Sequence, residues 1–312
     1  MTTTAQTTAQ TTAQTSDPTK RRHTLRRLLP ARGPSNIVLG IIAIVWLVPT
    51  VSLLVISLRP EAAFGVSGWW KALLDPSSLT FSNYRTLFGQ GFVAGGLLDS
   101  LMTSIEITVP ATLGVVLFSC FAGHSLVFGR WRGRDVVFLT VVALMVVPLQ
   151  VALIPVVQFY RELGTLFGLN PFGTIPGVII FHIAFGLPFG IFLMRNFMSG
   201  IPKDLLEAAR MEGAGEWKVF YRIVLPLALP ALASLAIFQF IWVWNDLLVA
   251  LVFLGGNVHT PLTVFLYDQN HELQANYWII STGAIVSVVV PLIVFFSFQR
   301  YFVRGVLAGA VK

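Results

Sequence analysis

Six long apolar stretches constrain this chain more than any other feature of its sequence. Each is long enough to cross the hydrocarbon core of a bilayer as an α-helix, which takes roughly 20 residues. They lie at about 37–58, 102–128, 136–157, 174–194, 226–254 and 278–299. Hydrophobic residues make up 55% of the 312 residues and charged residues only 11%, a balance that a soluble domain of this length could not bury. We therefore expect an all-α polytopic membrane protein with six transmembrane helices.

The Lys and Arg residues outside these stretches predict the orientation of the chain. Seventeen of them fall in one set of alternate segments and four in the other. The rich set is 1–36, 129–135, 195–225 and 300–312, and the poor set is 59–101, 158–173 and 255–277. Basic residues concentrate in cytoplasmic loops, so we expect both termini and the 195–225 segment in the cytoplasm. Because the charge of +7 follows this topology, it does not indicate a nucleic-acid partner.

The first 36 residues differ in composition from the rest of the chain. Residues 1–19 form a Thr- and Gln-rich polar repeat, and six basic residues follow between Lys20 and Arg32. Such a segment has no apolar face to bury, so we expect a disordered cytoplasmic tail over 1–36. The following apolar run is too long for a cleaved signal peptide. We expect one membrane domain over 37–312.

The segment between the fourth and fifth apolar stretches carries a different pattern. Pro202 suits the start of a helix, and Asp204 complements the positive end of its dipole. A narrow apolar stripe with helical spacing follows, formed by Ile201, Leu205, Ala208 and Ala209, with Leu206 beside it. Gly213 and Gly215 then break the helix before a second short helix at 216–221. This helix–turn–helix can dock in a groove of a cytoplasmic protein. The alternative is an amphipathic helix that lies on lipid.

A motif in this segment resembles the signature of permease subunits of ATP-binding-cassette (ABC) importers. Its positions are filled here by Glu207, Ala208, Ala209, Gly213, Ile223, Leu225 and Pro226. Residues 240–248, which read FIWVWNDLL, resemble the fifth-helix segment of carbohydrate permeases of the maltose-transporter type. The C-terminus from Gln299 to Lys312 resembles the tail of the second, G-type permease of that family, without its final glycine. The resemblance runs from about residue 37 to the end.

The resemblance implies a set of partners and a location. The loop around Glu207–Gly213 would be the coupling helix that inserts into a cleft of an ABC ATPase dimer, and the C-terminal tail would reach the dimer interface. A second, non-identical permease subunit would complete the translocation path. An extracytoplasmic sugar-binding protein would deliver the substrate. The membrane would be a bacterial-type inner membrane.

The sequence itself lacks the usual equipment for ATP hydrolysis. None of its lysines follows a glycine, so the Gly-Lys-Ser/Thr of a phosphate-binding loop is absent. We therefore expect a non-catalytic transport subunit, with ATP and magnesium bound by the partner ATPase. We expect no cofactor and no metal site, because His259, His271 and Glu272 lack the spacing of metal ligands.

A few ionisable and aromatic residues lie inside the apolar stretches. Glu106 and Asp246 are the carboxylates, and such residues usually face a bundle interior or water. Trp242, Trp244, Asn245 and Asp246 could line a sugar path. Alternatively, Asp246 forms an interhelical hydrogen bond, and in maltose-type systems the other permease makes the main sugar contacts. We expect His124 and His182 to donate hydrogen bonds to neighbouring helices.

The strongest alternative function is a proton-coupled secondary transporter that uses Glu106 and Asp246 as a relay. Such transporters often contain inverted repeats. The other half of this chain holds no second copy of the Glu-Ala-Ala loop. Copurification with an ATPase would separate the two hypotheses. The resemblance favours oligosaccharides such as α-glucosides, and it leaves monosaccharides, sugar alcohols and glycerol phosphates open.

Overall fold

The computed structural model describes residues 33–64, 66–271 and 276–310, and every regular element in these ranges is a helix. The chain divides into two compact units, Met1–Ser52 and Leu53–Lys312, and each is described by itself. Five helices are long and apolar enough to cross a membrane, and a bent pair of helices adds a sixth if it counts as one span. The prediction of an all-α polytopic membrane protein is confirmed. The tail predicted over 1–36 falls almost entirely outside the described residues.

Helix α2 (Gly33–Ser57) supplies the described part of the first unit. Its apolar side chains point to all sides, and large ones are exposed, with Ile37 at 65% and Trp46 at 79%. A helix that is apolar all round belongs in an apolar environment. The predicted first span over 37–58 therefore matches α2.

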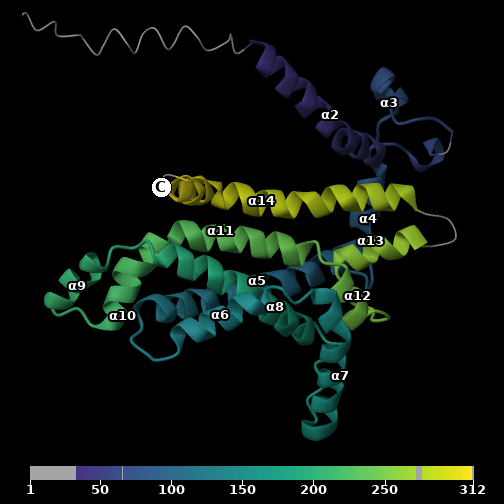
Figure 1. Cartoon of the computed structure of the whole chain (residues 1–312). Coiled ribbons are helices and arrows are strands. Elements are labelled where there is room, and N and C mark those ends of the chain that lie inside the picture. The colour runs from purple at the N-terminus through teal and green to yellow at the C-terminus, as the bar shows by residue number, and fades with distance from the viewer. Residues whose placement is uncertain (1–32, 65, 272–275, 311–312) are drawn as a thin grey trace, which may run out of the picture. The chain divides into compact units, whose positions relative to one another are not determined.

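Four long helices form the second unit: α5 (Leu97–Phe128), α8 (Ile175–Met198), α11 (Leu225–Trp244) and α14 (Tyr277–Ala310). Helix α5 packs against α8 and α11, and α11 also packs against α14 (Figure 1). The buried face of α5 is rich in small hydroxyl side chains, namely Ser100, Thr103, Ser104, Thr108, Thr112 and Ser119. Small side chains let neighbouring helices approach closely without exposing polar groups to lipid.

The third predicted span, at 136–157, corresponds to a broken helix. The chain forms α6 (Arg134–Leu144) and α7 (Leu149–Phe167), which are bent by 103°. Pro148 lies at the break in an extended conformation (φ −64°, ψ 129°). Because proline cannot donate a helical hydrogen bond and disfavours helical geometry in the residue before it, α6 ends and α7 starts in a new direction.

The fifth predicted span, at 226–254, is also interrupted. Helix α11 ends at Trp244, and α12 (Leu248–Leu254) starts after a short break. The amide of Asn245 donates to the carbonyl of Ile241 (2.7 Å), and the carboxylate of Asp246 accepts from the backbone N–H groups of Val249 and Ala250 (3.0 and 3.2 Å). Short polar side chains compete with the helical ladder in this way, and here they end one helix and cap the next.

Shorter helices complete the second unit. They are η1 (Glu61–Ala63), α3 (Lys71–Leu74), η2 (Pro76–Ser78), α4 (Ser82–Gly89) and α13 (Leu262–His271). Helix α4 is anchored by Asn83, whose amide donates to the carbonyls of Ser57 and Arg59. Helices α12 and α13 lie at one end of the bundle of α5, α8 and α11, and the segment predicted to be a coupling loop lies at the opposite end (Figure 1).

Candidate functional site

The predicted coupling segment begins with helix α9 (Lys203–Met211), which follows an extended Pro202. Leu206 is 1% exposed and Ile201 is 8% exposed, and both belong to a hydrophobic cluster with Met198 and Val219. The prediction placed Leu205 in the apolar stripe, but its side chain is 46% exposed. Helix α9 is rotated so that Leu206 faces the bundle, since this side chain fits between the end of α8 and the start of the next helix. Leu206 is thus the anchor of α9.

A tight turn ends α9 at the glycine of the motif. Gly213 has φ +82°, a left-handed backbone conformation that is strained for residues other than glycine. The N–H of Gly213 donates to the carbonyl of Arg210, and the N–H of Ala214 donates to the carbonyl of Ala209, both at 3.0 Å. These bonds satisfy carbonyls at the helix end in the usual manner of a glycine stop. Gly215, in contrast, has φ −68° and precedes the next helix.

A bidentate ion pair closes this turn. The guanidinium of Arg210 donates from Nε to Oε1 of Glu216 (2.8 Å) and from Nη2 to Oε2 (3.0 Å). The hydrogen bond to Glu216 raises the pKa of Arg210. The pair joins the end of α9 to the start of α10, and it fixes their relative direction more than it adds stability, because both side chains are accessible to water. Sequence reasoning missed it, since a turn of unknown geometry separates the two residues.

The second short helix predicted at 216–221 is not a separate element. Helix α10 (Glu216–Val219) continues through a π-helical turn, η3 (Phe220–Val224), into α11. The N–H of Leu225 donates to the carbonyl of Phe220, five residues back. Pro226 has no N–H for the carbonyl of Arg222, and its ring crowds that carbonyl, so the helix widens here. Ile223 and Leu225 are half-buried at this turn, whereas Pro226 is exposed.

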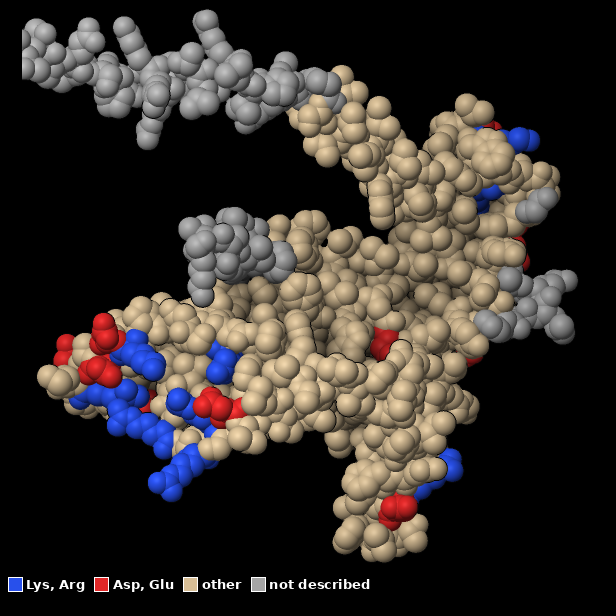
Figure 2. Space-filling model, viewed as in Figure 1, with Lys and Arg blue, Asp and Glu red and all other residues tan. Residues whose placement is uncertain are grey.

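The motif residues therefore serve two elements. Glu207, Ala208, Ala209 and Gly213 lie together on α9 and its turn, while Ile223, Leu225 and Pro226 shape the start of α11. Next to these residues the coupling segment exposes four large apolar side chains, those of Leu205, Met211, Trp217 and Tyr221. Met211 is 89% exposed and Trp217 68%. Charged side chains gather at this end of the visible face, in contrast to the tan middle of the bundle (Figure 2).

The four residues predicted to line a sugar path are not brought together. Trp244 is 2% exposed, donates from Nε1 to the carbonyl of Ser287 (3.0 Å) and stacks on Phe240. Asn245 and Asp246 are engaged at the break between α11 and α12. Trp242 lines the large cavity described next, whereas Trp244 and Asp246 border a separate void of only about 10 Å³.

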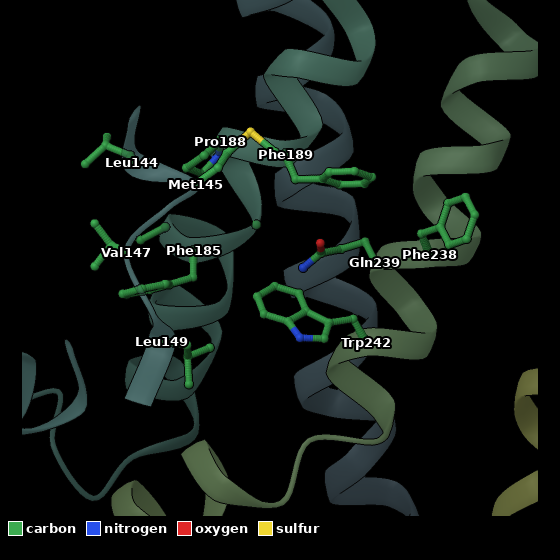
Figure 3. A pocket seen from close by; sticks show the side chains of 12 residues that line it. Leu144, Met145, Val147, Leu149, Phe185, Pro188, Phe189, Phe238, Gln239 and Trp242 are labelled. Carbon is green, nitrogen blue, oxygen red and sulfur yellow. The ribbon is translucent and has the colours of Figure 1, made fainter. Parts of the chain in front are cut away.

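That cavity has a volume of about 590 Å³ and lies between the α6–α7 break, α8 and α11 (Figure 3). Its lining consists of Leu144, Met145, Val147, Leu149, Ala184, Phe185, Gly186, Pro188, Phe189, Phe238, Gln239 and Trp242. Gln239 was missed by sequence reasoning. Gln239 is one of the few polar residues in the apolar helix α11, and this feature of the sequence could have indicated a functional role.

The two histidines on α5 and α8, His124 and His182, differ from what the sequence predicts. His182 is 1% exposed, and its Nε2 lies 3.7 Å from Oδ2 of Asp246, while its Nδ1 has no hydrogen-bond partner among the described residues. His124 makes an edge-on contact with the ring of Phe220 (centroids 4.8 Å apart), and its Nε2 likewise has no partner in the described part. Glu106 is exposed on α5, and within the described ranges no hydrogen bond or ion pair links it to Asp246.

A family model and several known permease proteins match this sequence. Residues 115–308 match the family model "Binding-protein-dependent transport system inner membrane component". The osmoprotective compounds uptake permease protein GgtD of Synechocystis sp. is 42% identical over 89% of this chain and 92% of its own. The alpha-glucoside transport system permease protein AglG of Rhizobium meliloti is 44% identical over 76% of this chain and 61% of its own.

One solved structure supports the fold. It is the crystal structure of a bacterial ABC transporter involved in the import of the acidic polysaccharide alginate, with a TM-score of 0.72. The alignment covers 93% of this chain and 100% of the matched chain at 24% identity. At that identity the similarity establishes a common arrangement of helices and no more.

Proposed function

The chain belongs to the binding-protein-dependent transport system inner membrane components, and from this premise we propose that it is a permease subunit of an ATP-driven importer of neutral carbohydrates. Members of this family are non-catalytic, multi-pass subunits that bind no cofactor, and they work with a separate ATPase and a periplasmic binding protein. The proton-relay hypothesis for Glu106 and Asp246 is not needed, because the energy source lies in the partner. We further propose a substrate class, a cytoplasmic location for the coupling segment, a second permease subunit as partner, and the residues that contact the ATPase.

The substrate class is inferred from relatives and motifs. The names of two similar proteins refer to alpha-glucosides and to osmoprotective compounds. The segment at 240–248 resembles carbohydrate permeases of the maltose type. We infer an α-glucoside or a related small oligosaccharide as the substrate. The same resemblance supports a second, non-identical permease subunit as the partner within the membrane.

Helix α9 is buried on one side and accessible on the other, and this observation supports the coupling role. Its inner side is held in the core by Leu206, and its turn is closed by Gly213 and by the Arg210–Glu216 pair. Its outer side, with Ala208 and Met211, is accessible. A helix that is firmly attached on one side and accessible on the other can transmit a push to the bundle. The positive-inside rule supports its placement in the cytoplasm, next to the ATPase.

The mechanism follows from this attachment. Closure of the ATPase dimer on ATP binding would move the docked α9 as a rigid body. Because α10 continues through η3 into α11, a displacement of α9 is transmitted to a helix that lines the 590 Å³ cavity. ATP binding would thereby bias the bundle between two states, one open to each side. The buried cluster around Leu206 and Phe220 resists local slippage during this movement.

Ala208→Trp tests the coupling surface. The bulky side chain would project from the exposed side of α9 and prevent docking, while the buried contacts of Leu206 remain. We expect loss of ATPase copurification and of ATP-driven uptake of an α-glucoside in proteoliposomes. The matched control is Ala62→Trp, because Ala62 is also exposed but lies in the segment predicted on the other side of the membrane. Normal ATPase binding and uptake by Ala208→Trp would refute the assignment.

A further inference from the structure

We propose that the cavity between α8 and α11 is a binding subsite for a neutral saccharide, in which Gln239 hydrogen-bonds to sugar hydroxyls and Trp242 covers an apolar face of the ring. This inference rests on the proposed function, a carbohydrate importer. It goes beyond it by assigning substrate contacts to this subunit, where the family resemblance assigns the main ones to the other permease. The residues that carry it are Gln239, Trp242 and Gly186.

The side chain of Gln239 is the strongest indication of a polar ligand. It lines the cavity and is only 3% exposed, yet its Nε2 has no hydrogen-bond partner among the described residues. Figure 3 shows the amide pointing from α11 into the space beside α8. A buried amide without a partner is unfavourable unless a ligand or water supplies the missing bond. An amide both donates and accepts, which matches the hydroxyl groups of a sugar.

Gly186 on α8 makes room for this amide. A Cβ atom at this position would lie 2.7 Å from Nε2 of Gln239 and 2.8 Å from its Oε1, and 2.7 Å from Cγ2 of Val115. Any larger residue would therefore displace the amide from its place in the cavity. The amide of Gln239 thus lies against the backbone of α8, in space that only glycine at position 186 leaves open.

Trp242 lies one helical turn from Gln239, so both side chains occupy the same face of α11. Its indole is 39% exposed and projects into the cavity below the amide (Figure 3). On one side it makes an edge-on contact with the ring of His182, with centroids 5.8 Å apart. The buried His182 thereby restrains the indole. A sugar ring has apolar C–H faces and polar edges, and this pair of side chains presents a matching aromatic plane and amide.

The size and charge of the cavity define the class of sugar. Pockets that hold small molecules have volumes of roughly 300–1,000 Å³, and this one has about 590 Å³. Among the described residues that line it, none is charged. A uronate or a sugar phosphate would lose its hydration there without gaining a counter-charge, so a neutral sugar is favoured. A lipid acyl chain would leave the Gln239 amide unpaired.

The test uses the whole transporter, with its ATPase, second permease and binding protein, in proteoliposomes. Uptake of labelled sucrose, trehalose and maltose is measured together with ATP hydrolysis. We expect Gln239→Leu to lower the sugar transported per ATP by roughly tenfold, the size expected for one lost hydrogen bond. Trp242→Leu removes the aromatic plane and should also lower this ratio. Assembly should be unchanged, since leucine removes an unpaired buried amide. Trp242→Phe should retain part of the activity, and Leu229→Ala, on the exposed side of α11 outside the cavity, should retain all of it.

Other results would overturn the subsite. One is an unchanged ratio of sugar to ATP in both leucine variants. Another is loss of the second permease from the complex with a normal ratio in what assembles, which would make the cavity a subunit interface. Transport of only charged sugars by the wild type would refute the subsite and the neutral substrate class, and would leave the role as an ATP-driven importer permease intact. Uptake that does not require ATP would refute the importer function itself, as would the absence of uptake for every sugar tested.

Discussion

Replacing Gly213 with alanine tests whether the left-handed turn holds α9 in its coupling orientation, and Gly215→Ala is a closely matched control. The two glycines are two residues apart, and a Cβ atom added to either would meet nothing within 4 Å. They differ in backbone conformation, with φ +82° at Gly213 and φ −68° at Gly215. Any difference between the two variants therefore reports on backbone strain rather than on a clash.

The expected magnitude follows from the conformations. Holding a residue with a Cβ in the left-handed region costs about 1–2 kcal/mol, which corresponds to a factor of roughly 5–30 in the population of the turn. At Gly215, alanine stabilises the fold by about 0.4–1 kcal/mol because it reduces the entropy of the unfolded chain. It also destabilises the start of α10, because glycine is preferred to alanine at the position before a helix. These two effects oppose each other, so the net change at Gly215 should be close to zero.

Hydrogen–deuterium exchange over 208–216 and ATP-driven uptake are the measurements. In Gly213→Ala the amides of Gly213 and Ala214, which donate to Arg210 and Ala209, should exchange roughly 5–30-fold faster. Uptake per ATP should fall, while α5 and α8 keep their protection. Gly215→Ala should resemble the wild type in both measurements. Equal effects of the two substitutions, or a protected turn in Gly213→Ala, would refute the reasoning.

Three further substitutions separate anchoring, packing and capping. Leu206→Ala should destabilise the attachment of α9 by about 2–5 kcal/mol and reduce ATPase copurification, with the volume-conserving Leu206→Met as control. Trp244→Phe removes the hydrogen bond to Ser287 and should cost about 0.5–1.5 kcal/mol in thermal stability, with unchanged sugar transport per ATP. Asp246→Ala should cost about 0.5–2 kcal/mol and speed amide exchange at Val249 and Ala250; unaltered exchange would exclude the capping role.

The membrane class and the approximate spans could be predicted because they depend on local composition. A bilayer imposes a minimum apolar length on any helix that crosses it, so α5, α8 and α14 lie close to the predicted 102–128, 174–194 and 278–299. The two interrupted spans show the limit of this reasoning. Hydropathy treats Pro148 and Asn245 as minor interruptions, although a missing N–H and a side chain that bonds to the backbone are sufficient to end a helix.

Local sequence was also sufficient to predict a helix over α9 and a glycine turn at Gly213, because propensity and a special backbone angle act over a few residues. Which side of α9 is buried was decided only when it packed on the ends of α8 and α10, and this reversed the roles of Leu205 and Leu206. The Arg210–Glu216 pair and the approach of Gln239 to Gly186 depend on the directions in which helices meet. Those directions arise from contacts between distant segments, which the order of residues along the chain does not reveal.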